Sequence, residues 1–215
     1  MCIHERGATS WEEAAYDAMR GIITTNIGVR YLRLHQAEFD IAGPSGYDHH
    51  GLIFAPAACN IAQLMTLAGP LILPIVKLIM RHTLLALDFL HHEVHCLHTD
   101  VKANNVLLKL SDSTLLKELA QSFVDEPLQS KGSREEGTLV YRSRHLKDLG
   151  HDGWDAPILS DLGKARLLGD ESDHEPLPLG PEAYRAPENV LDMRWGYTID
   201  IWQAGCMLYN LLTDD

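Results

Sequence analysis

The chain has 215 residues, a formal net charge of −12 and an apolar content of 46%. This length allows one domain or a small two-lobed one, and the apolar content allows a sizeable core. The acidic charge disfavours nucleic acid and anionic membranes as partners and favours basic ones, although an acidic protein without any electrostatic preference explains it equally well.

Signals for secretion, membrane insertion and metal binding are weak. Residues 1–6 are polar and lack the apolar segment of a signal peptide. The most apolar run, residues 64–76, is too short to span a bilayer, and prolines interrupt it. The four cysteines show no Cys-x-x-Cys spacing, which favours free thiols in a reducing compartment, the cytoplasm and/or the nucleus. A zinc site is disfavoured, because no cysteine or second histidine pair stands at finger spacing beside His91, His92, His95 and His98.

The first elements are a helix and a strand pair. Residues 11–21 consist mostly of good helix formers and end on Gly21, a natural helix stop. Residues 38–41 alternate polar and apolar side chains, as a half-buried strand does. The turn cluster at 43–46 precedes the apolar residues 51–54, which predicts a returning strand.

A long helix and a polar loop follow. Residues 73–92 carry apolar side chains at helical spacing, with Pro74 in the first turn, where its missing N–H costs nothing. The loop His98-Thr99-Asp100-Val101-Lys102-Ala103-Asn104-Asn105 then places a carboxylate, an ammonium and a carboxamide before the apolar residues 106–108. Phosphoryl transfer uses such groups to orient a hydroxyl, steady the phosphoryl group and hold Mg²⁺. Asp and Asn also cluster in ordinary turns, which is the alternative explanation for this loop alone.

The segment after the loop is long. Residues 113–123 predict an amphipathic helix with an apolar stripe. Residues 130–137 are polar and are expected to be mobile, and residues 148–157 have the composition of a loop. Such a segment serves as a docking element or is simply tolerated, since a surface loop of this size costs little closure entropy.

Three later motifs complete a set. Ser160-Asp161-Leu162-Gly163 is Asp-Phe-Gly with Leu for Phe, and Tyr184-Arg185-Ala186-Pro187-Glu188 contains Ala-Pro-Glu. Asp200-Ile201-Trp202-Gln203-Ala204-Gly205 has the pattern Asp-x-Trp-x-x-Gly. With the His-x-Asp-x-Lys-x-x-Asn loop, these motifs resemble the eukaryotic protein kinases from about Glu12 to the end. His-Thr-Asp in place of His-Arg-Asp is similar to the SR-protein kinases.

The resemblance implies an α+β, protein-kinase-like fold. Residues 1–57 would be the remnant of a kinase N-lobe and hinge, with the family's C-helix and its fourth and fifth strands. Residues 58–215 would be a partial, mostly helical C-lobe, truncated at its C-terminus. The long segment would be an insert at about 109–157, where SR-protein-kinase-like sequences also carry one.

The resemblance also implies roles for the loop residues. Asp100 would be the catalytic base, and Lys102 would contact the γ-phosphate of ATP, as in the Ser/Thr kinases. Asn105 and Asp161 would hold Mg²⁺. Thr99 replaces the arginine that grips an activation-loop phosphate in most kinases, which indicates that activity does not wait for that phosphorylation.

Further positions follow from register with the family. ATP would meet Phe54 as gatekeeper and the hinge residues Ala55 and Ala57, besides Lys102, Asn105 and Asp161. Four residues would have structural roles: Glu12, His98, Glu188 and Asp200. The C-helix glutamate falls best on Glu12 and next on Glu13, although an ordinary acidic helix start explains both equally well.

Parts of the family pattern are absent from this sequence. No Gly-rich loop or Val-Ala-Ile-Lys lysine precedes Glu12, and the helices around the central helix, with the arginine that pairs with Glu188, are missing. The resemblance therefore indicates a kinase domain cut at both ends. We expect such a chain to turn over ATP feebly and to be poorly stable, with an exposed central helix.

The sequence thus favours a serine/threonine protein kinase of SR-protein-kinase type, with ATP and Mg²⁺ as cofactors. Its substrates would be basic, Arg/Ser-rich proteins, with no direct binding to nucleic acid or membrane. The alternative is a catalytically dead kinase remnant, either a binding module or a non-functional fragment. Small-molecule phosphotransferases with a related loop are disfavoured by Ala-Pro-Glu and the central-helix motif.

Overall fold

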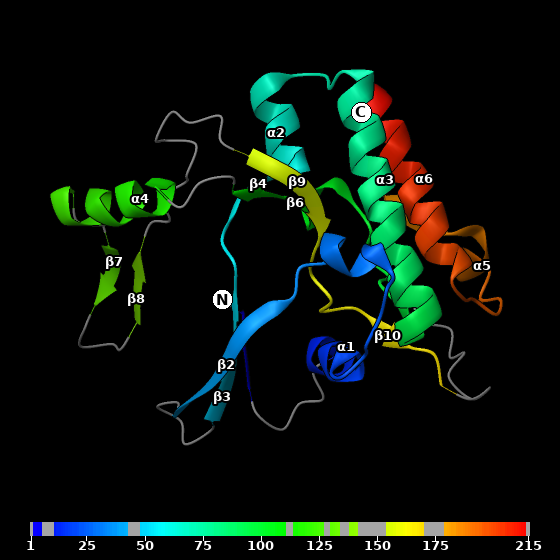
Figure 1. The fold of residues 1–215 in the computed structure, drawn as a ribbon, viewed down its shortest axis with the longest axis horizontal. Coiled ribbons are helices and arrows are strands. Elements are labelled where there is room, and N and C mark those ends of the chain that lie inside the picture. Colours follow the sequence, from blue (N-terminus) through cyan, green and yellow to red (C-terminus); the bar gives the residue numbers. More distant parts are fainter. Residues whose placement is uncertain are drawn as a thin grey trace.

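The computed structural model describes residues 2–5, 11–42, 48–110, 114–126, 130–133, 138–141, 154–169 and 179–213. A β-hairpin with one helix beside it lies at one end of the molecule, and a group of long helices lies at the other (Figure 1). Short strands and loops connect the two groups. None of the helices within the described ranges has the length and apolar character to cross a membrane.

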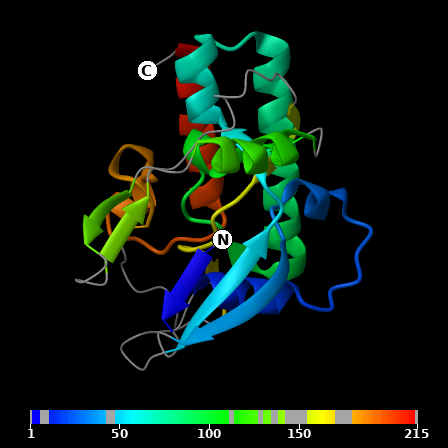
Figure 2. The same cartoon turned by 90° about the vertical axis from the view of Figure 1, so that its left-hand side faces the viewer.

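The hairpin consists of β2 (His35–Ala42) and β3 (Asp48–Phe54), which pair antiparallel. β1 (Cys2–Glu5) pairs with the other edge of β3, as Figure 2 shows. The predicted strand pair is confirmed, and both strands are longer than expected. α1 (Trp11–Met19) lies beside the hairpin and buries Ala15 and Tyr16, whose ring packs edge-on against His35 at 4.9 Å. The 3₁₀ helix η1 (Ile27–Tyr31) joins α1 to β2.

The helical part is built on α3 (Leu73–Phe89), which packs against α6 (Thr198–Thr213). The two helices run side by side in Figures 1 and 2. α3 buries an apolar face, as its periodicity predicts, and Met207 and Leu211 of α6 belong to the same core. α2 (Ile61–Ala68) precedes α3 and begins with a capping box made by its flanking Asn60.

The end of α3 sets the position of the polar loop. The helix passes into a π turn, η2 (Leu90–Val94), which His95 closes at φ +55°. The short strand β5 (Cys96–Leu97) follows and pairs with β10 (Arg166–Leu167). The polar loop then ends in η3 (Ala103–Asn105) and leads into β6 (Val106–Leu110). The loop is therefore fixed at both ends by short strands over the α3–α6 pair.

β6 is the middle strand of a sheet with β4 (Ala57–Asn60) and β9 (Trp154–Leu159). Val106 lies opposite Leu159 in this sheet. The expectation of a loop over residues 148–157 was therefore wrong from Trp154 onward, because an edge of β6 was open for pairing. Residues 148–153 lie outside the described part of the chain.

The described elements between β6 and β9 lie apart from the helical group (Figure 1). α4 (Thr114–Asp125) confirms the predicted amphipathic helix, yet Phe123 on its stripe is 37% exposed. β7 (Ser130–Ser133) pairs with β8 (Thr138–Tyr141), so the first four residues of the polar segment 130–137 form a strand, while residues 134–137 lie outside the described part of the chain. The backbone hydrogen bonds of a strand pair do not require apolar side chains, so a polar sequence can form one.

The segment before α6 contains η5 (Glu182–Tyr184) and α5 (Pro187–Val190). Its core is a small second cluster in which Leu97 from β5 meets Leu179, Trp195 and Ile199. This cluster places the described part of the segment against the polar loop and the start of α6.

Candidate functional site

The carboxylate of Asp100 is the centre of the site. Its side chain is only 3% exposed, and its Oδ2 accepts hydrogen bonds from Lys102 Nζ at 2.8 Å and Asn105 Nδ2 at 3.1 Å. Lys164 Nζ lies 3.3 Å from the same oxygen. The other oxygen, Oδ1, is buried and has no hydrogen-bond partner among the described residues. The loop thus holds a carboxylate with one saturated oxygen and one that is ready to accept a proton donor.

The electrostatics of Asp100 result from two opposing effects. Burial acts to raise the pKa of its carboxyl group, whereas Lys102 and Lys164 act to lower it. The lysines prevail, so the pKa of Asp100 lies below its usual value and the group is ionised at neutral pH.

Asp200 and Gln203, one turn apart on α6, hold the loop from below. Asp200 accepts from His98 N at 2.8 Å and from Thr99 N at 2.7 Å. Gln203 accepts from Val101 N and donates to Thr99 O, both at 2.8 Å. The backbone on both sides of the Asp100 carboxylate is therefore hydrogen-bonded to a single helix, and these buried polar groups are satisfied.

Gly180 places the segment before α5 against Gln203 and Thr99. Its φ is +80°, and a Cβ at this position would collide with the Gln203 amide and approach Thr99 O to 2.9 Å. Only glycine permits this close contact, so residue 180 fixes where the segment crosses the loop.

The four histidines that invited a zinc interpretation have separate partners. His98 Nε2 donates to Ser160 O at 3.0 Å, and its Nδ1 accepts from Asp100 N at 3.3 Å. His91 Nε2 lies 2.8 Å from Asp200 Oδ2. His92 is close to Asp88, and His95 is close to the Tyr197 hydroxyl. No group of three metal-binding side chains occurs among the described residues.

Asn105 and Asp161 are brought together through the backbone. Ser160, the residue before Asp161, donates its N–H and its hydroxyl to Asn105 O at 2.8 and 2.9 Å. The Asn105 amide nitrogen makes the bonds to Asp100, which leaves its oxygen as the atom suited to a cation. Asp161 is exposed at φ +72°. Two oxygen ligands of this kind fit Mg²⁺, which takes its remaining ligands from phosphates and water.

At the proposed hinge, Phe54 and Ala57 are half-buried and Ala55 is exposed. Arg33, which the sequence did not single out, donates from Nη2 to Ala55 O at 3.0 Å. Its guanidinium lies 4.8 Å from the centre of the Phe54 ring, close enough for a cation–π contact. The backbone carbonyl of Ala55 is thus occupied by a side chain of the protein itself.

Glu12 is buried at the start of α1. Burial lowers the pKa of Arg33, and the negative charge of Glu12 acts in the opposite direction. Glu12 thus acts on the Arg33 guanidinium, which stands in the connection between η1 and β2.

Comparison with protein-family models gives no match. A serine/threonine protein kinase of Aspergillus fumigatus is 33% identical over 200 residues, which cover 91% of this chain and 46% of that protein. The serine/threonine-protein kinase SRPK of Physarum polycephalum is 27% identical, over 98% of this chain and 53% of that protein. The chain is a homologue of the serine/threonine protein kinases. It spans about half the length of these relatives.

The fold agrees with this homology. A crystal structure of a kinase domain superposes with a TM-score of 0.62 and 23% identity, over 95% of this chain and 53% of that one. The prediction of a partial kinase fold is confirmed. At this level of identity the superposition shows the fold alone.

Glu188 of the Ala-Pro-Glu motif, which the sequence predicted to lack its arginine partner, has a hydroxyl beside it. Thr198 Oγ1 donates to Glu188 Oε1 at 2.8 Å. Glu188 is half-buried, so a neutral hydroxyl satisfies it where a buried carboxylate would need a cation. In the same segment, the hydroxyl of Tyr184 accepts a hydrogen bond from Asn210 Nδ2 at 3.0 Å.

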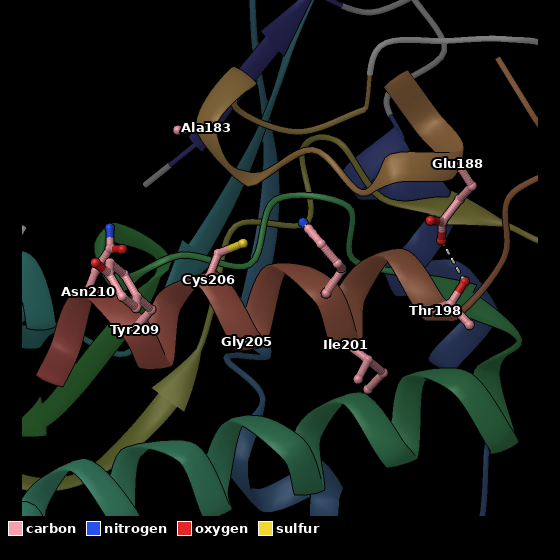
Figure 3. Close-up of a pocket in the computed structure, with 9 residues that line it drawn as sticks. Ala183, Glu188, Thr198, Ile201, Gly205, Cys206, Tyr209 and Asn210 are labelled. Carbon is pink, nitrogen blue, oxygen red and sulfur yellow. Dashed lines mark hydrogen bonds between the residues drawn. The ribbon is translucent and has the colours of Figure 1, made fainter. Parts of the chain in front are cut away.

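A groove of about 790 Å³ runs along α6, between this helix and the segment that contains Ala183 and Glu188. Figure 3 shows Glu188 and Thr198 at one end of this groove and Tyr209 and Asn210 at the other. Ile201 and Trp202 line it and are 51% and 46% exposed. This exposure on one face of the central helix agrees with what the sequence predicted.

Sequence reasoning missed three residues of the site: Arg33, Lys164 and Gln203. Gln203 stands inside the Asp-x-Trp-x-x-Gly motif and faces the loop because it lies three residues after Asp200. That spacing was a usable signal. Lys164 directly follows the Asp-Leu-Gly motif, but nothing local marks it as a neighbour of Asp100.

Proposed function

We propose that the chain is the catalytic portion of a serine/threonine protein kinase, which transfers the γ-phosphoryl group of ATP to a serine or threonine hydroxyl of a protein. The observation that carries this proposal is the buried Oδ1 of Asp100, which lies beside Lys102 and Asn105 and has no hydrogen-bond partner within the described part of the chain. An ionised carboxylate with one open oxygen can orient a hydroxyl and accept its proton.

The neighbouring residues have matching roles in this proposal. Lys102 Nζ, 2.8 Å from Asp100, would contact the transferred phosphoryl group. Asn105 and Asp161 would hold Mg²⁺, whose positive charge offsets the negative charge of the phosphates. Asp200, with Gln203, keeps Asp100 in place by holding the backbone on either side of it. His98 connects the loop to Ser160 and hence to Asp161.

The substrate class follows from charge and similarity. The chain carries a net charge of −12, which favours basic partners. One relative bears the name SRPK, and this chain has His-Thr-Asp at the corresponding loop. Both support Arg/Ser-rich proteins as substrates, with nucleic acid and membranes not bound directly. The proposal extends to the cytoplasm and/or the nucleus as the place of action.

The competing function is a non-catalytic kinase module. One observation favours it: Arg33 donates to the Ala55 carbonyl, the group that would accept a hydrogen bond from the adenine edge. A protein side chain at this carbonyl weakens nucleotide binding, because the contact must be broken before adenine can use it.

Phosphate transfer from labelled ATP to an Arg-Ser peptide separates the two functions. We expect a slow transfer that falls to background in Asp100→Asn, because a carboxamide is a poor proton acceptor. Asp125→Asn on α4 removes an equal charge far from the loop and should keep the wild-type rate. Transfer by Asp100→Asn at the wild-type rate would exclude Asp100 as the base.

Nucleotide binding gives a second, independent measurement. A ligand at a hundredfold excess over its Kd stabilises the folded state by about 2.7 kcal/mol. A thermal shift with Mg·ATP is therefore expected. No shift at millimolar Mg·ATP, together with no transfer, would support the non-catalytic module.

A further inference from the structure

We propose that Lys164 is a second phosphoryl-binding cation of the site and that Thr99 positions it. The proposal rests on the kinase function above and adds two residues to it. Neither residue is among those to which the catalytic-loop motif gives a contact with the phosphates of ATP.

Two ammonium groups from different segments converge on one carboxylate oxygen. Lys102 comes from the loop itself and lies 2.8 Å from Asp100 Oδ2. Lys164 comes from the segment after Asp-Leu-Gly and lies 3.3 Å from the same oxygen. One lysine is enough to neutralise the Asp100 carboxylate, so the Lys164 ammonium is available to a second anion. A positive charge at this place attracts the phosphate chain of a nucleotide.

The exposure of the two lysines differs in a way that suits two roles. The side chain of Lys102 is 25% exposed, whereas that of Lys164 is 55% exposed. Lys164 also forms the longer contact, so it exchanges the carboxylate for another anion at lower cost. When a triphosphate binds, the Lys164 ammonium can move from Asp100 to its terminal phosphate, while Lys102 stays beside the base.

Thr99 fixes the backbone from which Lys164 extends. Its hydroxyl donates to Lys164 O at 2.6 Å, across 65 residues of sequence. Thr99 itself is fully buried at φ +66°, and both of its backbone polar groups are bonded to α6, through Asp200 and Gln203. The residue is therefore held rigidly, and its hydroxyl transmits that position to Lys164. Valine has the same shape but no hydroxyl and cannot do so.

The distinguishing measurement is the ratio of the Kd values for Mg·ADP and Mg·ATP, obtained by calorimetric titration of the 215-residue chain. A cation at the terminal phosphate favours ATP over ADP. In Lys164→Met we expect ATP affinity to fall roughly 10- to 100-fold, the range for a hydrogen bond to a charged group, with ADP affinity nearly unchanged. Lys164→Arg should keep the preference for ATP. Lys117→Met on α4 is the matched control, since it removes one exposed lysine far from the loop.

Thr99 is tested by its coupling to Lys164. Thr99→Val should weaken ATP binding in the same direction, and Thr99→Ser should restore it, because serine keeps the hydroxyl. The double variant Thr99→Val, Lys164→Met should bind ATP no more weakly than Lys164→Met alone, since one residue acts through the other. A purely structural role of Thr99 would instead give additive losses and would weaken ADP binding equally.

Three results are decisive. Wild-type binding of both nucleotides with an unchanged ratio in Lys164→Met overturns this proposal and leaves the kinase function standing. Additive effects of the two substitutions overturn the role of Thr99. Absence of any nucleotide binding by the wild-type chain overturns both this proposal and the kinase function.

Discussion

Asp200 offers the strongest test of how the site is held together. It is fully buried and accepts three hydrogen bonds: from His91 Nε2, His98 N and Thr99 N, at 2.7 to 2.8 Å. Asp200→Ala leaves all three donors without an acceptor. Asp200→Asn keeps one acceptor oxygen and turns an NH₂ group toward the remaining donors, so at least one donor is stranded.

The magnitudes follow from the number of stranded donors. Each buried donor without a partner costs about 1–3 kcal/mol, so Asp200→Asn should lower the free energy of unfolding by about 1–3 kcal/mol and Asp200→Ala by roughly 3–9 kcal/mol. The larger loss is comparable with the whole stability of a typical domain, roughly 5–15 kcal/mol. Asp200→Ala is therefore expected to be largely unfolded.

Urea denaturation followed by circular dichroism measures both losses, with Asp125→Asn and Asp125→Ala on the exposed α4 as controls of equal charge change. Hydrogen exchange at His98 and Thr99 gives a local readout, since their amides lose protection first. If Asp200→Ala unfolded within about 1 kcal/mol of the wild type, the three contacts would not carry the stability assigned to them.

Burial and charge set three further outcomes. Burial lowers the pKa of His82 from 6.5, so the contribution of the neutral imidazole to stability is complete above that pH and is lost as the pH falls below it. The urea concentration at the unfolding midpoint should therefore fall when the pH is lowered from about 7.5 to about 5.5. An equally large fall in His82→Gln would contradict this. Burial raises the pKa of the Cys96 thiol to about 12. Iodoacetamide should therefore label the partly exposed Cys206 in the folded chain but Cys96 only after unfolding, which mass spectrometry of peptides measures. Rapid labelling of Cys96 in the folded chain would refute this expectation. Arg33→Met frees the Ala55 carbonyl and should tighten Mg·ATP binding about fivefold, the value of one hydrogen bond, whereas an unchanged Kd would mean that Arg33 does not compete with adenine.

Local patterns in the sequence were sufficient for the elements that local forces determine. The apolar spacing of residues 73–92 predicted α3, and Pro74 marked its start. The fixed spacing of Asp100, Lys102 and Asn105 placed three polar groups on one short loop. In the structure, Lys102 Nζ and Asn105 Nδ2 lie 2.8 and 3.1 Å from Asp100 Oδ2. Short separations in sequence leave the chain few other arrangements.

Long-range pairing accounts for most of what was missed. Strand β9 contains Pro157 and follows polar residues, so its composition is that of a loop, yet pairing with β6 makes it a strand. Context of this kind overrides strand propensity. The contact of Arg33 with Ala55 and that of Thr99 with Lys164 span 22 and 65 residues. No periodic pattern links residues at such separations, so only the folded backbone shows them together.

The two ends of the proposed nucleotide site differ in how well their groups are arranged to contact ATP. At the phosphate end, Asp100 is ionised, held in place by α6 and flanked by two lysines, so the groups for chemistry are already arranged. At the adenine end, the Ala55 carbonyl is occupied by Arg33. Preorganisation at the phosphate end acts on the rate once ATP is bound, whereas competition at the hinge acts on affinity. This arrangement therefore favours a chain that binds ATP weakly but transfers phosphate at a detectable rate when ATP is saturating. Separate measurement of kcat and of KM for ATP distinguishes such a chain from a non-catalytic module, in which both binding and transfer fail.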